Sequence, residues 1–146
     1  MSQPVASQRF VTLSKAKGPK PTPSCSIRRD PSDPLRRLVL LCSGGRAVAL
    51  GHQVFLPDDC ADDPAVLAHE LHHVRQYEEW GLLRYYARGV REQVQYLLSR
   101  AGLAASPYDW RRGGIRRFEE YGMEQQGQIV EDAARGDRVA GEIMRG

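Results

Sequence analysis

Composition and charge narrow the class of protein. The chain has 146 residues, with 21 Lys and Arg against 18 Asp and Glu and a formal net charge of +3 at pH 7. This length suits one small domain with a modest core, and so weak a positive charge gives little support for nucleic-acid binding. The three cysteines, Cys25, Cys42 and Cys60, lack metal-site spacing, which predicts reduced thiols.

Residues 1–34 are expected to form a flexible N-terminal arm. The arm has basic residues but no following apolar run of the kind a signal peptide needs, and the apolar stretch at residues 38–42 is too short to span a membrane. We therefore expect no membrane insertion, and a protein that is cytoplasmic or exported by a specialised secretion system. Proline disfavours regular structure, and six of the nine prolines lie in the arm, at Pro4, Pro19, Pro21, Pro23, Pro31 and Pro34.

Two strands are predicted next, at residues 35–43 and 46–56, with a Gly44-Gly45 turn between them. They would form the small sheet of a domain that spans residues 35–146. The strand that ends near Leu56 could bind a peptide substrate by pairing along its edge. In that strand, alternation places one set of side chains on a single face, namely Val48, Leu50, His52, Val54 and Leu56.

A helix is predicted to begin at Asp63-Pro64 and to end near Trp80-Gly81. Asp is a good N-cap, Pro suits the first helical position, and Gly favours a stop. An apolar stripe for the core follows from the helical spacing of Leu67, Leu71 and Val74.

An H-E-x-x-H motif, residues 69–73, lies inside this helix. Residues i and i+4 share a helical face, so His69 and His73 can offer two imidazole nitrogens to one zinc ion. Glu70 is placed to accept a proton from a water at the metal. His72 lies about 100° from His73 around the helix, and we expect it at the surface or beside the ligands. Three of the four histidines of the chain fall within five positions, which argues against a chance arrangement.

Further helices are predicted at residues 82–101 and 118–134, joined by a loop at 102–114. A third zinc ligand has to come from a later helix, and spacing alone does not choose it. The last helix carries Glu120, Glu124, Gln128 and Glu131 along one face, and for Glu131 we expect a solvent-exposed position. The earlier helix is expected to bury an apolar seam formed by Leu83, Tyr86, Val90, Val94, Leu97 and Ala101.

Residues 67–76 resemble the "LLAHELTHVxQ" core of small zincin-like peptidase domains, the minimal gluzincins of bacterial polymorphic toxins and of proteins associated with contractile injection systems. Residues 49–56 resemble the "TxGxxIxF" strand of that family, and residues 121–130 resemble its "YxxEQQAxIV" element. The resemblance implies an α+β zincin-like fold with a small N-terminal β-hairpin or sheet, followed by three main helices that include the H-E-x-x-H helix. It also implies that Glu124 is the third zinc ligand.

Two departures from the family pattern accompany this resemblance. Gly127 replaces the usual Ala, which weakens a helix slightly. Gln128 stands four positions after Glu124, where many gluzincins have an acidic residue. The group that orients the first histidine is therefore not identified by the sequence.

Together these features predict a zinc-dependent peptidase that acts on a peptide or protein substrate. One Zn²⁺ per chain would be held by His69, His73 and Glu124, with Glu70 as the general base. Through the resemblance, a larger secretion or toxin system is a further expected partner. The candidates for contacts with the oxyanion or the substrate are Tyr121, His52, Tyr86 and Tyr108.

Other classes of function stay open. One is a non-catalytic, zinc-containing docking or assembly module, or a domain associated with a secreted toxin or effector. Such a module could lose Glu70, which this chain retains. Residues 110–117 place four arginines beside Trp110, but the low net charge makes nucleic acid an unexpected partner. Cys25, on the expected arm, is a weakly supported candidate for an inhibitory fourth zinc ligand.

Overall fold

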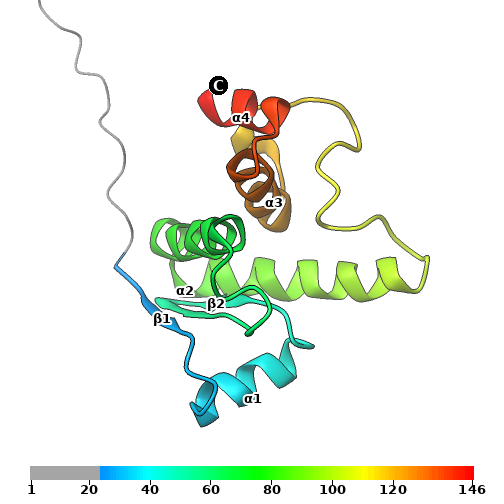
Figure 1. The fold of residues 1–146 in the computed structure, drawn as a ribbon. Coiled ribbons are helices and arrows are strands. Elements are labelled where there is room, and N and C mark those ends of the chain that lie inside the picture. The colour runs from blue at the N-terminus through cyan, green and yellow to red at the C-terminus, as the bar shows by residue number, and fades with distance from the viewer. Residues whose placement is uncertain (1–23) are drawn as a thin grey trace, which may run out of the picture.

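The computed structural model describes residues 24–146, so most of the expected arm lies outside the described residues. The predicted α+β class is confirmed: a small three-stranded sheet lies against helices (Figure 1). The elements in chain order are β1 (Ser26–Arg28), α1 (Pro34–Cys42), β2 (Val48–Leu50), β3 (Gln53–Phe55), α2 (Pro64–Arg100), the 3₁₀ helix η1 (Phe118–Glu120), α3 (Met123–Ala134) and α4 (Arg138–Arg145).

The sheet has the order β1-β3-β2, with β1 parallel and β2 antiparallel to the central strand. Because β1 lies within the segment expected to be an arm, the folded part begins before residue 35. Because β3 is central, the strand that ends near Leu56 is not an edge strand, and the prediction that it pairs with a substrate along its edge is wrong. β2 lies at one edge of the sheet and contacts the second half of α2, because its Ala49 carbonyl accepts a hydrogen bond from the Tyr85 hydroxyl at 2.9 Å.

Residues 34–42 form a helix where a strand was predicted. The Asp33 carboxylate accepts hydrogen bonds from the backbone N–H of Leu35 and Arg36, and Pro34 occupies the first turn. Arg36 is buried, and its guanidinium donates to the Leu56 carbonyl at 2.8 Å and to Asp58 at 2.6 Å. A short apolar run is compatible with either structure, and the cap together with this anchor selects the helix.

The predicted strand at residues 46–56 is divided by a turn at Gly51 and His52. Gly51 has φ +59°, a left-handed conformation that Gly adopts without strain. The turn yields β2 and β3, and it moves His52 out of the strands. The prediction that His52 shares one face with Val48 and Val54 is therefore wrong.

Helix α2 consists of two helices joined at Gly81, whose φ of 74° and ψ of 168° are not helical. This confirms the break predicted after Trp80. Figure 1 shows that the two halves run in different directions. The seam predicted to be buried on residues 82–101 is instead largely exposed: Leu83 is 84% exposed and Val90 65%. The opposite face of this half, which carries the buried Tyr85, is the one that packs against the domain.

Two hydrophobic clusters hold the elements together. The first joins the sheet to the start of α2, and the second joins the loop before η1 to α3 and α4. The buried members are Ala49, Val54, Leu56 and Val74 in the first cluster and Trp110, Tyr121, Ile129, Ala140 and Ile143 in the second.

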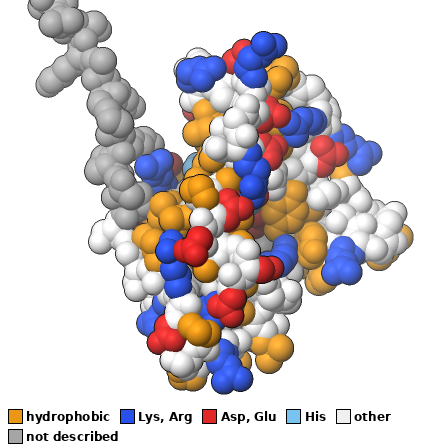
Figure 2. All heavy atoms as spheres, viewed as in Figure 1, with side chains coloured by type: hydrophobic (Ala, Val, Ile, Leu, Met, Phe, Trp, Pro, Cys, Tyr) orange, Lys and Arg blue, Asp and Glu red, His pale blue; other side chains and the backbone are white. Residues whose placement is uncertain are grey.

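Hydrophobic side chains also appear on the surface, between basic and acidic groups (Figure 2). Within residues 24–146, no helix has both the length and the apolar character that crossing a membrane requires.

Candidate metal centre

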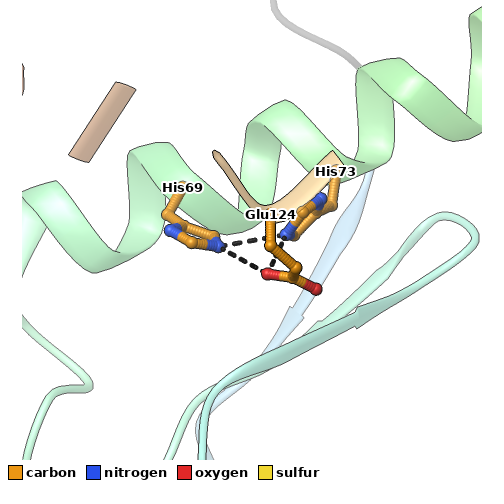
Figure 3. A group of neighbouring side chains, drawn as sticks. All are labelled: His69, His73 and Glu124. Atoms are coloured by element: carbon orange, nitrogen blue, oxygen red, sulfur yellow. Dashed lines mark hydrogen bonds and ion pairs between the residues drawn. The ribbon is translucent and has the colours of Figure 1, made fainter. Parts of the chain in front are cut away.

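Three of the side chains predicted to bind zinc converge between α2 and α3. His69 and His73 lie one turn apart on α2, and their Nε2 atoms are 3.0 Å from each other. The Glu124 Oε2, from the first turn of α3, lies 3.5 Å from the His69 Nε2 and 3.3 Å from the His73 Nε2. Figure 3 shows both rings directed at this carboxylate. The three candidate ligand atoms lie within 4.8 Å of one another, a spacing that one ion can bridge.

Both imidazole rings are held by partners on their far nitrogens. The Nδ1 of His69 lies 3.1 Å from the Glu131 Oε2, and the Nδ1 of His73 lies 2.7 Å from the Gln76 Oε1. Since both partners are acceptors, each Nδ1 carries the proton and each Nε2 is left to act as a ligand. Glu131 was predicted to face solvent, but its side chain is 18% exposed and orients the first histidine.

The donor set fits a zinc ion. Two neutral Nε2 atoms and a carboxylate oxygen are the ligands of His₂Glu zinc sites. With both Nδ1 atoms protonated, the Nε2 lone pairs of His69 and His73 face one another and repel unless a cation lies between them. Without a metal ion, a proton bound to one Nε2 is needed to relieve this repulsion. Burial alone lowers the pKa of His69, but Glu124 and Glu131 outweigh it and raise the pKa to about 10.

Glu70 lies beside the convergent ligands and is 5% exposed. Its Oε2 has no hydrogen-bond partner among the described residues. A buried carboxylate oxygen of this kind needs a water or a ligand to satisfy it. Burial raises the pKa of the Glu70 carboxyl, and the neighbouring His73 and His69 partly oppose that shift. A buried carboxyl group beside the candidate ligands is a candidate for proton transfer.

The position of Glu124 depends on a residue that the sequence did not single out. Glu92, on the second half of α2, accepts hydrogen bonds from the backbone N–H of Met123 and of Glu124, both at 2.7 Å. A carboxylate at a helix N-terminus satisfies N–H groups that lack partners within the helix. Glu92 thereby fixes where α3 begins and turns Glu124 toward the histidines. Glu120 precedes α3 in η1 and pairs with Arg117 at 2.8 Å.

Gly127 provides the space in which the His69 ring lies. A Cβ atom at residue 127 would be 2.7 Å from the His69 Nε2 and 2.9 Å from its Cδ2 and Cε1. Distances below 3.0 Å require a neighbour to move. The Gly that replaces the usual Ala therefore has a packing reason at this site, one turn of α3 away from Glu124.

The candidate ligands form one wall of a pocket of about 880 Å³. Of the predicted contact residues, Tyr86 and Tyr108 line this pocket, whereas Tyr121 and His52 do not. The Tyr121 hydroxyl accepts a hydrogen bond from the Arg116 backbone N–H at 2.9 Å, within the second hydrophobic cluster. His52 lies in the turn after β2, with its Nδ1 3.1 Å from the Ser24 carbonyl oxygen. The structure therefore does not place Tyr121 and His52 at the pocket, and sequence analysis missed Tyr85, which does line it.

His72 and Cys25 are held in packing contacts outside the candidate ligand group. His72 places its Nε2 3.3 Å from the Gln126 Oε1 and its ring edge-on to Phe118, and burial lowers its pKa to about 4. It is not a member of the ligand group, as predicted. Cys25 packs against the sheet cluster, and burial raises the pKa of its thiol. The hypothesis that Cys25 caps the metal is therefore wrong.

A family model described as the eCIS core domain matches residues 41–81. The matched segment runs from the end of α1 through β2 and β3 into the first half of α2. It contains His69, Glu70 and His73 but not Glu124. Comparison with curated proteins gives no match. Comparison with solved structures gives none either. Over this segment the chain is similar to the core domain of extracellular contractile injection systems.

Proposed function

We propose that this chain is a zinc-dependent peptidase associated with a contractile injection system. The observation that carries the peptidase assignment is the convergence of His69, His73 and Glu124, with ligand atoms within 4.8 Å of one another. The family match supports the association with a larger assembly. Glu70, buried directly beside these groups, adds the acid–base function that peptide hydrolysis needs.

Each role in hydrolysis has a candidate residue. His69, His73 and Glu124 would hold the zinc ion, which when bound would supply a Lewis acid able to lower the pKa of water toward about 7 and to polarise a carbonyl. Glu70 accepts the proton of the attacking water and passes it to the leaving amide nitrogen. Burial raises the pKa of Tyr108, so its hydroxyl keeps the proton and can donate to the substrate carbonyl oxygen.

The pocket has the size and the walls for a peptide. Its volume of about 880 Å³ lies in the range of small-molecule and peptide sites. Apolar side chains from α1 and β2 line part of the pocket, among them Leu38, Val39, Val48 and Leu50. These side chains can exclude water around a bound peptide, which strengthens electrostatic interactions at the reacting groups.

Glu70→Gln is the variant that tests the proposal. The amide keeps the size of the carboxyl but cannot accept the proton. We expect the variant to retain about one zinc per chain, a stoichiometry that follows from the one ligand group among residues 24–146. We expect it to lose peptidase activity by about 10²- to 10⁴-fold. The matched control is Glu78→Gln, on the same half of α2 but outside the pocket lining, which should leave zinc content and activity unchanged.

Activity is first sought with peptide libraries, and zinc content is measured by elemental analysis. A parent protein that takes up no transition metal on titration contradicts the zinc site. Equal cleavage by the parent and by Glu70→Gln contradicts the role of Glu70 while leaving the protein a peptidase.

A docking or assembly module is the second candidate function. The exposed apolar face on the second half of α2 favours it, since apolar surface of this kind often marks an interaction site. One edge of that face carries Arg84, Arg88 and Arg91, which suits a partner helix with an acidic edge. A parent protein that holds a full zinc yet cleaves nothing across the library screen favours this candidate over the peptidase. The face includes Leu83, Val90, Val94, Leu97 and Leu98.

A further inference from the structure

Arg46 is the one arginine or lysine among the described residues that line the pocket. Arg46 lies between α1 and β2, and three contacts hold its guanidinium. The Nε donates to the Ser43 carbonyl at 3.3 Å, one terminal nitrogen donates to the Tyr108 hydroxyl at 2.8 Å, and the other donates to the Gln93 Oε1 at 3.3 Å. The guanidinium also stacks on the Tyr96 ring, 4.4 Å from its centroid. Arg46 is thus held in a defined position at the pocket wall.

All of these partners are neutral. Arg46 forms no ion pair within the described part of the chain, whereas Arg36, the other arginine that anchors α1 and the sheet, pairs with Asp58 at 2.6 Å. A guanidinium has five N–H donors in a planar fork, and the three contacts above engage one each. Two N–H groups are left for a further acceptor. A planar fork with free donors matches the geometry of a carboxylate.

Tyr108 connects Arg46 to the metal centre. Its ring centroid lies 6.4 Å from that of His69, and its hydroxyl accepts the hydrogen bond from Arg46. An extended peptide advances roughly 3.5 Å per residue. A carboxylate bound at Arg46 would therefore lie within about three residues of a bond cut at the metal centre.

We propose that Arg46 is a carboxylate subsite of the peptide-binding pocket. On this assignment the preferred substrates carry a carboxylate within about three residues of the scissile bond. It can be the C-terminal carboxylate of the peptide or an acidic side chain, because the guanidinium recognises the same group in both. The inference rests on the proposed peptidase function and adds the class of substrate to it.

Binding of three labelled peptides to zinc-loaded Glu70→Gln protein tests the subsite. They are fluorescein-labelled tetrapeptides of one apolar sequence: a free acid, its C-terminal amide, and an amide in which one residue is replaced by glutamate. We expect at least one of the two carboxylate peptides to bind about tenfold to a hundredfold more tightly than the neutral amide. Which of them gains affinity identifies the source of the carboxylate.

Arg46→Gln, introduced into the same Glu70→Gln protein, should bring this affinity ratio to about one. Arg84→Gln is the matched control, because Arg84 is exposed and outside the pocket lining; it should preserve the ratio. An equal loss of affinity for acid and amide peptides assigns Arg46 a structural role through Tyr108 and overturns the proposal.

The wild-type arginine gives a test that needs no folded Arg46 variant. If the three peptides bind Glu70→Gln protein with equal affinity, the carboxylate subsite is wrong, while cleavage of neutral peptides by the parent would leave the peptidase assignment intact. If the zinc-loaded parent neither binds nor cleaves any peptide, the proposed function fails and the subsite fails with it.

Discussion

The substitution Gly127→Ala adds one methyl group that favours the helix but crowds the His69 ring. In an exposed helix this change stabilises by about 1 kcal/mol, because Ala has the higher helix propensity. Here the new Cβ would meet the His69 ring at 2.7 Å, against an ordinary van der Waals contact of 3.4 Å or more. The ring, or the helix that carries Gly127, has to move by about 0.7 Å, and overpacking of this kind costs about 1–3 kcal/mol.

The ring has little freedom to move away. Its Nδ1 is bound to Glu131 at 3.1 Å, and its Nε2 faces His73 at 3.0 Å. The overpacking cost and the propensity gain together give a metal-free protein that is up to about 2 kcal/mol less stable than the parent. The substitution should also lower zinc affinity, because disturbing the contacts that hold a metal ligand in place typically costs 10- to 100-fold in metal affinity.

Zinc affinity is measured by competition with a chromophoric chelator, and stability by urea unfolding with and without metal. Gly141→Ala is the matched control, since Gly141 lies in α4 and an added Cβ would meet only the Arg145 side chain, at 3.5 Å. It should leave zinc affinity unchanged and raise stability by up to about 1 kcal/mol. If Gly127→Ala behaves like Gly141→Ala, the placement of His69 against Gly127 is refuted.

Two further predictions concern the same site. Glu124→Ala should abolish tight zinc binding, because it removes a predicted ligand. Glu131→Ala should weaken zinc binding by about 10- to 100-fold, because the His69 ring loses its hydrogen-bond acceptor. Glu120→Ala should change zinc affinity little, and a chelator competition in which it weakens zinc binding as much as the other two variants would contradict the assignment. In the metal-free protein the pKa of His69 is raised from 6.5 to about 10, so its contribution to stability is fully present below pH 6.5 and is lost as the pH rises through about 10. Zinc binding needs the neutral imidazole, so zinc affinity should increase with pH over that range and uptake should release protons; calorimetry in buffers of different ionisation enthalpy that detects no proton release would contradict this.

Local sequence determined the H-E-x-x-H helix. The Asp63 cap, Pro64 and the stop at Gly81 are local signals, and each acts in the structure as expected. The convergence of His69 and His73 follows from the i, i+4 spacing, which any α-helix converts into one face. Glu70 is placed by the same geometry. These predictions succeed because they need only the helix itself.

Elements that depend on distant partners could not be read in the same way. The apolar run at residues 35–43 suits a strand or a helix, and the helix results from the Asp33 cap and from the contact of Arg36 with Leu56. On residues 82–101 the apolar spacing correctly predicts a helix. Which face is buried depends on what packs against it, and in this half of α2 the buried residue is Tyr85, on the face opposite the predicted seam.

Tertiary structure alone decided how the carboxylates divide their roles. The sequence places Glu120, Glu124 and Glu131 on one expected stripe, and only the resemblance favoured Glu124. In the fold, Glu92 accepts the first N–H groups of α3 and so fixes the phase of that helix. Glu124 then faces the histidines, Glu131 reaches the Nδ1 of His69 two turns later, and Glu120 lies outside the helix. The phase of one helix relative to another is set by packing and long-range hydrogen bonds, which residue spacing within a single helix does not encode.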